Sequence, residues 1–303
     1  MAFNEKYRGQ AALLIRVLPY VAEEKCFALK GGTAINLFAR DMPRLSVDID
    51  LAYLPIQPRP ESLAAIEAAL KRVAQAPKKG IEGIHVTETK TEGRVNKLLV
   101  SLRGVQIAVE VNPVMRGTAH PVETREVTET VEAELGYAEI QVVSFADLYG
   151  GKLVAALDRQ HPRDFFDVRD LMANEGIDDA VRRAFIVYLL SHNRPMFEVL
   201  KANRKDITQH YQSAFVGMTE EEVPLDDLLT AREEMIADIV GKMPDAHKKF
   251  LVSFERGQPD WRLLGVEGAA DLPAVKWRQQ KLDELPAERR TALVKSLEEV
   301  LFG

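Results

Sequence analysis

The sequence has almost no cysteine and no long apolar run. A single cysteine, Cys26, occurs in 303 residues, which excludes a disulfide framework within the chain and is typical of a reducing cytosol. No apolar run approaches the roughly 18 residues of a membrane span. The N-terminus is polar, and the apolar stretch after it is broken by Arg16 and Pro19, so the sequence shows no secretory signal. We therefore expect a cytoplasmic protein without a membrane anchor.

The sequence also lacks a large excess of basic charge. The 40 basic and 46 acidic residues give a net charge of −6, which excludes a globally basic nucleic-acid-binding protein. Residues 71–103 differ from the chain as a whole, because they contain eight basic residues and only three acidic ones. The basic residues are Lys71, Arg72, Lys78, Lys79, Lys90, Arg94, Lys97 and Arg103, and the acidic ones are Glu82, Glu88 and Glu92. This basic stretch could contact RNA phosphates, or it could be the solvated surface of a helix and a hairpin.

The pattern of apolar residues predicts two domains. Residues 1–143 contain both helix-like and strand-like patterns of apolar residues, whereas residues 144–303 are mainly helical in pattern. We therefore predict an α+β fold class: a mixed β-sheet domain followed by a mainly α-helical domain. In the first domain we expect helices at 4–24, 33–39 and 61–76, and strands at 26–29, 47–54, 81–89, 94–103, 105–111, 123–128 and 138–143. In the second we expect a helix from residue 145 and helices at 163–174, 178–191, 225–240, 244–255 and 286–301.

Asp48-Ile49-Asp50 lies within a predicted strand. Side chains alternate along a strand, so Asp48 and Asp50 should share one face and Ile49 the other. Two carboxylates on one face can bind a hard cation such as Mg²⁺, and two such ions can hold the attacking and leaving oxygens of phosphoryl transfer. The alternative is a strand end with a solvated acidic face.

Two further features could complete such a site. Gly31 and Gly32 separate a predicted strand from a predicted helix, where backbone N–H groups can approach a phosphate, although a Gly-Gly pair can also be a plain turn. No G-K-[ST] follows, so this segment is not a P-loop. Glu110 interrupts the apolar strand Ile107–Val111, and it faces either water or the same site.

The combination resembles a known family. The segments that carry the resemblance are Leu29–Ala34, Arg44–Leu51, Gly151–Arg159 and Pro162–Val168. They are similar to the AbiEii/AbiGii toxin family of nucleotidyltransferases, within the polymerase-β-like superfamily. The resemblance implies a nucleotidyltransferase-type sheet domain and an active site between the two domains, to which the helical domain contributes Lys152 and Asp164.

The resemblance also implies roles for individual residues. The metal ligands would be Asp48, Asp50 and Glu110, holding Mg²⁺ in a two-metal site. The groups that bind the NTP would be Gly31, Gly32, Thr33, Arg44, Ser46 and Lys152. The catalytic residues would be Asp48, Asp50, Lys152 and Asp164. Asp164 would position the acceptor, deprotonate it or orient Lys152, and Asp167 would be structural.

The activity implied is that of a toxin in a toxin–antitoxin system with a role in phage defence. It would transfer NMP from NTP to an RNA acceptor, expected to be tRNA, and so block translation and growth. A cognate antitoxin encoded alongside would be its partner. The alternatives are a small-molecule or protein acceptor, and a non-catalytic nucleotide-binding regulatory module.

Overall fold

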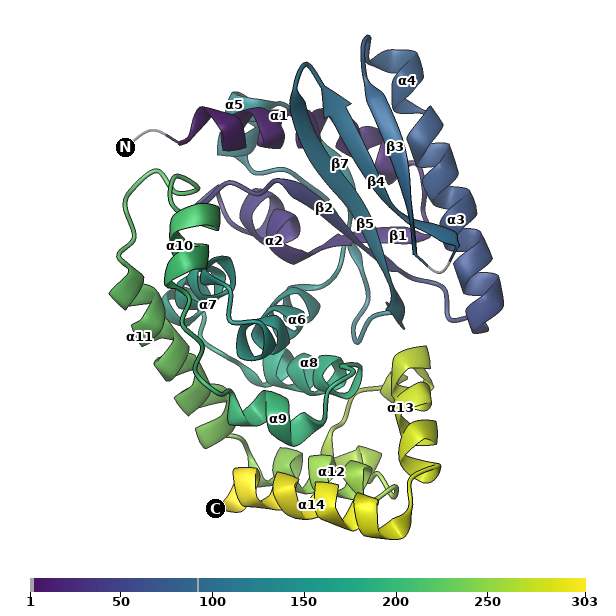
Figure 1. The fold of residues 1–303 in the computed structure, drawn as a ribbon, viewed down its shortest axis with the longest axis vertical. Helices are drawn as coiled ribbons and strands as arrows, with labels where there is room; N and C mark the ends of the chain where they lie inside the picture. Colours follow the sequence, from purple (N-terminus) through teal and green to yellow (C-terminus); the bar gives the residue numbers. More distant parts are fainter. Residues whose placement is uncertain (1–2, 92) are drawn as a thin grey trace. The chain divides into compact units, whose positions relative to one another are not determined.

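The computed structural model describes residues 3–91 and 93–303 (Figure 1). The chain forms two compact units. The first comprises the chain up to Ser144 together with Phe215–Glu222, and the second comprises Phe145–Ala214 and Val223–Gly303. The first unit is mixed α and β and the second is helical, so the predicted α+β fold class is confirmed.

A mixed sheet forms the centre of the first unit. Its seven strands in the described residues follow the order β3-β4-β5-β2-β1-β7-β6. The β2–β5 and β1–β7 pairs are parallel and the other pairs are antiparallel. The strands are β1 (Phe27–Lys30), β2 (Asp48–Tyr53), β3 (His85–Thr91), β4 (Arg94–Leu102), β5 (Val105–Arg116), β6 (Glu123–Glu126) and β7 (Glu139–Val142).

The two faces of this sheet differ in burial. Leu98, Val100 and Val109 lie on one face and are at most 1% exposed, whereas Lys97 and Glu110 on the other face are partly exposed. Helices α1 (Glu5–Ala22) and α3 (Arg59–Gln75) pack on the sheet with apolar stripes. The remaining helices of this unit are α2 (Gly31–Ala34), a π-helix (Ile35–Ala39), α4 (Pro77–Gly80) and α5 (Glu129–Leu135). The open face is the one that can present polar groups to a ligand.

The segment Phe215–Glu222 joins the first unit although the sequence placed it in the helical part. The Leu45 amide donates to the Met218 carbonyl over 2.7 Å, and the Asn4 amide donates to the Gly217 carbonyl over 3.0 Å. Phe215 and Met218 are each only 1% exposed. Because these contacts join residues that are far apart in the sequence, the periodicity of apolar residues could not predict them.

The second unit consists of helices. The α-helices are α6 (Phe145–Asp158), α7 (Pro162–Asn174), α8 (Asp179–Leu190), α9 (Met196–Lys201), α10 (Thr208–Ala214), α11 (Leu225–Ile236), α12 (Asp245–Glu255), α13 (Pro273–Asp283) and α14 (Ala287–Phe302). A π-helix (Ala237–Gly241) follows α11, and two short 3-10 helices (Trp261–Leu263 and Ala269–Asp271) lie between α12 and α13. Helices α6 and α8 approach closely at Gly150, where an added Cβ would lie 2.7 Å from the Phe185 nitrogen. Among the described residues, no helix is both long and apolar enough to cross a bilayer.

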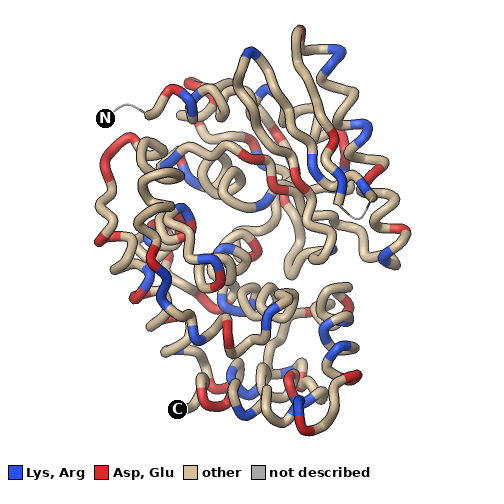
Figure 2. Tube along the Cα trace, viewed as in Figure 1, with Lys and Arg blue, Asp and Glu red and all other residues tan. Residues whose placement is uncertain are grey.

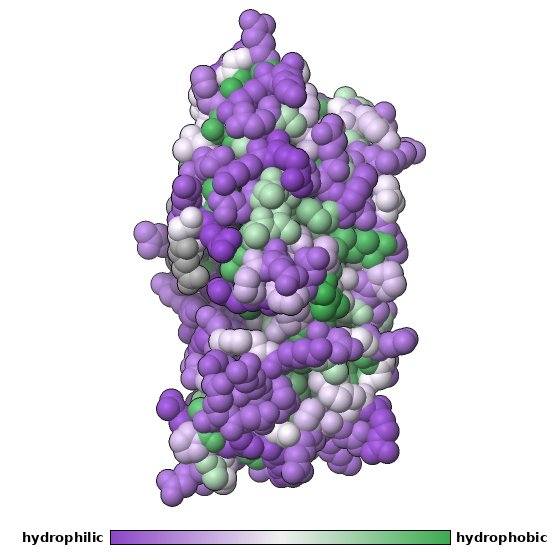
Figure 3. All heavy atoms as spheres, turned by 90° about the vertical axis from the view of Figure 1, so that its right-hand side faces the viewer, coloured by the Kyte–Doolittle hydropathy of each residue, from purple (hydrophilic) through white to green (hydrophobic). Residues whose placement is uncertain are grey.

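The surface mixes hydrophilic and apolar side chains. Figure 3 shows the side of the first unit that carries α3, where an apolar area is bordered by hydrophilic residues. Ile56 and Val114 belong to the exposed large apolar residues of this unit, at 55% and 49% exposure.

Candidate active site

Two carboxylates occupy the open face of the central strand β2. Ile49 is fully buried, whereas Asp48 and Asp50 on either side of it are only partly buried, so both aspartates point to the face opposite Ile49. In the parallel pairing of β2 with β5, Asp50 is opposite Glu110. Residues directly opposite each other share a sheet face, which puts Glu110 on the same face as the two aspartates. Acidic residues accordingly mark these central strands in Figure 2.

The Glu110 carboxylate has a basic partner. Lys97 is opposite Glu110 in the β4–β5 pairing, and its Nζ lies 3.2 Å from Glu110 Oε2. Within the described residues, no three acidic, histidine or cysteine side chains are grouped so as to hold a metal ion. The hard oxygen donors of Asp48 and Asp50 fit a divalent ion, while Glu110 is held by Lys97.

The Gly31-Gly32 turn brings the backbone next to these carboxylates. Gly31 has a φ of +73°, and a Cβ at this position would lie 2.7 Å from Asp50 Oδ2. A Cβ at Gly32 would lie 2.7 Å from Arg44 Nη2. The positive φ favours glycine at position 31, and an added Cβ at either position would have to move the Asp50 carboxylate or the end of the Arg44 side chain.

Three of the predicted nucleotide-binding side chains are buried around this turn. Thr33 Oγ1 donates to the Asp48 carbonyl over 2.5 Å and lies 2.9 Å from Ser46 Oγ. Arg44 is 2% exposed, and its Nη1 donates to the Leu45 carbonyl over 3.0 Å. The observed contacts of Thr33, Arg44 and Ser46 therefore hold the glycine turn against the start of β2.

A second cluster of charges lies in the helical unit. Lys152 Nζ on α6 lies 2.8 Å from Asp164 Oδ1 and 2.9 Å from Asp167 Oδ2, both on α7. Arg159 donates to both Asp164 oxygens, over 2.6 Å from Nε and 2.8 Å from Nη2. The lysine side chain is 5% exposed and the two aspartates are fully buried, so the structure brings Lys152 together with Asp164, Asp167 and Arg159.

These contacts determine the protonation of Asp164. Burial alone would raise the pKa of its carboxyl, but the Lys152 charge and the hydrogen bonds from Arg159 outweigh burial and hold that pKa well below its usual range. Asp164 is therefore a permanent carboxylate at neutral pH and a weak proton acceptor.

His161 fixes the start of α7. It is the N-cap of this helix, and its Nδ1 accepts a hydrogen bond from the Arg163 amide over 3.2 Å. Burial, and then the nearby Arg163, lower the pKa of His161 to about 4. The cap places Asp164 in the first turn, facing α6.

Sequence reasoning gave no role to Arg159 or to the Lys97–Glu110 pair. Arg159 directly follows α6 and comes seven residues, about two helical turns, after Lys152, so helical spacing puts both on one side. The Lys97–Glu110 pair follows from the hairpin between β4 and β5. Arg103 and Gly104 in its turn have φ of +50° and +83°, and this turn fixes the register that sets Lys97 opposite Glu110. The sequence therefore contains a signal for Arg159, which is its helical spacing from Lys152, and a signal for the Lys97–Glu110 pair, which is the turn between β4 and β5.

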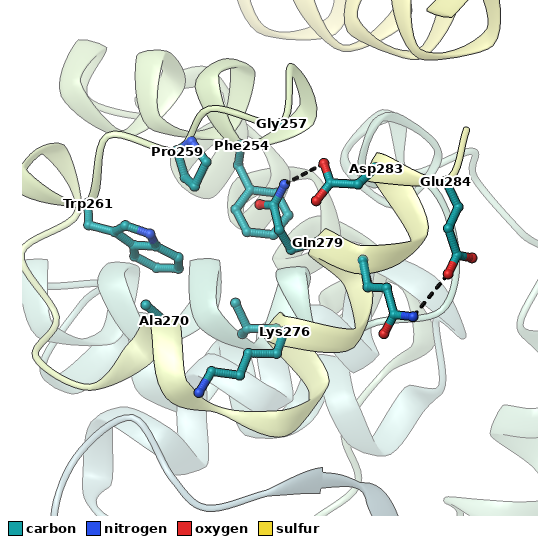
Figure 4. A pocket seen from close by; sticks show the side chains of 11 residues that line it. Phe254, Gly257, Pro259, Trp261, Ala270, Lys276, Gln279, Asp283 and Glu284 are labelled. Atoms are coloured by element: carbon teal, nitrogen blue, oxygen red, sulfur yellow. Dashed lines mark hydrogen bonds between the residues drawn. The ribbon is translucent and has the colours of Figure 1, made fainter. Parts of the chain in front are cut away.

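A pocket in the helical unit lies among residues that the sequence did not single out (Figure 4). It has a volume of about 620 Å³ and includes Phe254, Trp261, Lys276, Gln279 and Asp283. In Figure 4 the amide nitrogen of Gln279 points to Asp283, while Trp261 stands on the opposite side. None of the predicted site residues lines this pocket.

Comparisons with known proteins give one family match and a match in fold. The family described as "Nucleotidyl transferase AbiEii toxin, Type IV TA system" matches residues 12–281. The fold is similar to that of MenT4, a nucleotidyltransferase toxin from Mycobacterium tuberculosis H37Rv, with a TM-score of 0.61 and 16% identity over 91% of this chain and 93% of MenT4. No curated protein matches the sequence.

Proposed function

The chain belongs to the AbiEii family of nucleotidyltransferase toxins of type IV toxin–antitoxin systems, and from this premise we propose that it transfers NMP from an NTP to a hydroxyl of an RNA acceptor. The acceptor oxygen forms a bond to the α-phosphorus, the bond from that phosphorus to the α,β-bridging oxygen breaks, and pyrophosphate leaves. The hydroxyl proton passes to solvent. We take tRNA as the acceptor, since the family resemblance implies it.

One observation carries the proposal: Asp48 and Asp50 share a face of β2 beside the Gly31-Gly32 turn, where a Cβ on Gly31 would lie 2.7 Å from Asp50 Oδ2. Asp48 and Asp50 would hold a divalent ion, Mg²⁺ in this proposal, which supplies positive charge to the phosphate oxygens during transfer. Glu110 is the third candidate ligand, and it would first have to leave Lys97. The Gly31-Gly32 backbone would approach the triphosphate because no side chain intervenes.

The buried side chains of Thr33, Arg44 and Ser46 also support nucleotide binding at the Gly31-Gly32 turn. They hold the turn and the start of β2 together, so the N–H groups of the turn are preorganised rather than free to move. Arg44 adds a positive charge next to Gly32, which favours an anionic ligand at this turn. We therefore propose that these three residues contribute to nucleotide binding indirectly, by holding the backbone of the turn in place.

Lys152 would bind the NTP as a compact positive charge. The contacts of Asp164 favour one of its three possible roles, that of orienting Lys152. Its lowered pKa makes it a poor base for deprotonating the acceptor, and its oxygens are engaged by Lys152 and Arg159. We thus assign Asp164 to positioning Lys152, and Asp167 to the same task.

The biological consequence we propose is arrest of translation and growth in the cytoplasm. Modified tRNA would no longer serve the ribosome, and a cognate antitoxin encoded alongside would counteract the toxin. Expression of the wild-type chain should slow bacterial growth, whereas the variant with both Asp48 and Asp50 replaced by Asn should not.

The experiment that tests the reaction uses NTPs labelled at the α-phosphate. Purified protein, Mg²⁺ and each labelled NTP are incubated with total RNA, and the products are separated by size. We expect label in RNA of tRNA length, and none with γ-labelled NTP. Label in protein or small molecules instead would indicate a different acceptor, and tight NTP binding with no transfer would indicate a nucleotide-binding regulatory module.

A further inference from the structure

A row of four charged residues crosses the open face of the sheet. Lys97 of β4 lies opposite Glu110 of β5, and Glu110 lies opposite Asp50 of β2. Asp50 in turn lies opposite Lys30, the last residue of β1. Residues that lie opposite each other share a face of the sheet. The charges across these four neighbouring strands are therefore positive, negative, negative and positive, with two candidate metal ligands in the middle.

The side chain of Lys30 belongs to the face that carries Asp50. The backbone of Lys30 is extended, with φ of −139° and ψ of −175°, so this residue continues the alternation of β1 before the chain turns at Gly31. Leu29, one residue earlier, is fully buried on the opposite face, whereas Lys30 is only partly buried. The structure therefore places an ammonium group on the face of the candidate metal ligands, directly before the glycine turn.

Lys30 and Asp50 lie opposite each other without forming an ion pair. Opposite residues of an antiparallel pair have Cβ atoms about 4.5–5.5 Å apart, a separation that a lysine side chain can span. Within the part of the chain that the structure describes, neither of these two side chains takes part in an ion pair. Lys97, by contrast, lies 3.2 Å from Glu110 Oε2. The charge of Lys97 is therefore used to neutralise a carboxylate, whereas the charge of Lys30 is available to a ligand.

Two neighbouring side chains of opposite charge, neither of them paired, suit a ligand that carries both signs of charge. A divalent ion bound to a triphosphate is such a ligand, because the ion can bind the Asp50 carboxylate while a phosphate oxygen accepts from the ammonium group. We propose that Lys30 binds the β- or γ-phosphate of the NTP, which is the part that leaves as pyrophosphate. This inference rests on the proposed function and adds a residue to its nucleotide site.

The position of Lys30 favours the leaving phosphates over the α-phosphate. The α-phosphorus is the reacting atom, so it must lie at the ion that Asp48 and Asp50 would hold. Lys30 is on the next strand, about 4.8 Å further across the sheet, and it is joined directly to Gly31, where the proposed function places the triphosphate. The phosphates that extend from the ion towards this turn are the β- and γ-phosphates. A positive charge there would also stabilise the negative charge that develops on pyrophosphate during transfer.

A solvated surface lysine is the alternative role for Lys30, and its burial argues against that role. Lysine side chains are mostly exposed unless they are paired, whereas Lys30 is partly buried and has no ion pair among the described residues. Lys30, Gly31 and Asp50 also belong to the same compact unit. The inference therefore needs only the register of this sheet, and it does not depend on where the helical unit lies.

The test measures binding to the full chain rather than transfer. Wild type and Lys30→Met are titrated by calorimetry, with Mg²⁺ and without RNA, against each of the four NTPs, the corresponding NMPs and pyrophosphate. In Lys30→Met we expect the Kd for NTP and for pyrophosphate to rise at least tenfold, while the Kd for NMP stays within twofold. Lys30→Arg should keep part of the affinity, because it keeps the charge. Circular dichroism and the midpoint of thermal unfolding will check that both variants fold.

The matched control is Lys25→Met. Lys25 lies two residues before β1 begins at Phe27, so β1 separates it from the glycine turn. It is exposed and, like Lys30, takes part in no ion pair with any residue that the structure describes. Both substitutions remove one unpaired positive charge from the same unit, but only Lys30→Met removes it beside Asp50. In Lys25→Met the Kd for NTP and for pyrophosphate should stay within twofold of the wild type.

The outcomes separate this inference from the proposed function. If the wild type binds neither NTP nor pyrophosphate, the proposed function fails and the inference fails with it. If the wild type binds NTP and labels RNA but Lys30→Met keeps the wild-type Kd for NTP, the inference alone is wrong. An equal rise in the Kd for NTP and for NMP would place Lys30 elsewhere than at the leaving phosphates, and an equal loss of affinity in Lys25→Met would reduce the effect to overall charge; either result would overturn the inference.

Discussion

At the scale of single residues, the Gly31-Gly32 turn is the most constrained part of the candidate site. Gly31 combines a positive φ with a neighbour, Asp50 Oδ2, at 2.7 Å from where a Cβ would be. We predict that Gly31→Ala lowers the transfer rate at least a hundredfold, because the new methyl group must push the Asp50 carboxylate away. The initial rate of NMP transfer measures this effect.

The control for this prediction is Gly104→Ala. Gly104 also has a positive φ, of +83°, but has no neighbour within 4 Å of an added Cβ. Its variant should lose about 1 kcal/mol of stability from backbone strain and keep its activity. Equal activities of the Gly31 and Gly104 variants would show that the contact between an added Cβ and Asp50 does not affect the transfer rate.

At the scale of helices and strands, the buried cluster connects α6 to α7. Removing one charge from a buried, hydrogen-bonded ion pair typically costs about 3–5 kcal/mol. Asp164→Asn should therefore lower the free energy of unfolding by about that amount, as measured by urea denaturation at pH 7. An unchanged midpoint would contradict the buried contacts of Asp164 with Lys152 and Arg159.

The same variant should respond less to acid. The folded-state pKa of Asp164 is lowered, so its contribution to stability is present above the usual aspartate pKa of about 4 and is lost as the pH falls below it. Below pH 4 the wild type should lose stability more steeply than Asp164→Asn.

The cap of α7 gives a second pH dependence. His161 has a folded-state pKa of about 4, below the usual value of about 6.5, so its contribution is present above pH 6.5 and is lost as the pH falls from 6.5 to 4. In His161→Asn, which keeps an N-cap acceptor, the melting temperature should fall less than in the wild type between pH 7 and pH 5. Parallel curves for the two proteins would contradict this role of His161.

Local patterns were enough to predict most of these elements. Strand β2 and helices α1, α7 and α14 follow from period-2 and period-3.6 patterns over short windows, and the structure confirms them within about two residues. Helices α5, α9, α10 and α13 were missed, because the first three are short and α13 is rich in polar residues. Strand β3 begins at His85, later than predicted, since residues 81–84 lie outside it.

The part of the site that could be predicted is also local. The alternation of Asp48, Ile49 and Asp50 needs only the geometry of a strand. The partners of those residues are not local: the position of Glu110 depends on parallel pairing of β2 with β5, and the burial of Lys152 depends on packing of α6 against α7. The sequence does not show that Lys152 is buried, whereas its side chain is only 5% exposed in the structure.

At the scale of the whole molecule, the proposed function gives a role to Lys152 of the helical unit as well as to the carboxylates of the first unit. Lys152→Arg tests the contribution of the helical unit, because it keeps the positive charge that the two buried aspartates require. We predict that it folds and yet raises the KM for NTP at least fivefold, since a planar guanidinium cannot replace a compact ammonium. An unchanged KM for NTP would remove Lys152 from the nucleotide site.

The central claim is that the carboxylates on β2 carry out nucleotidyl transfer with a divalent ion. Its most direct test is the initial rate of NMP transfer from α-labelled NTP to RNA by Asp48→Asn, compared with the wild type, over a Mg²⁺ titration. Asp48 is a partly exposed strand residue, so the variant should retain the wild-type circular dichroism spectrum. We predict a rate at least a hundredfold below that of the wild type at every Mg²⁺ concentration, and no transfer by either protein in EDTA. A folded Asp48→Asn variant with a rate close to that of the wild type would contradict the account.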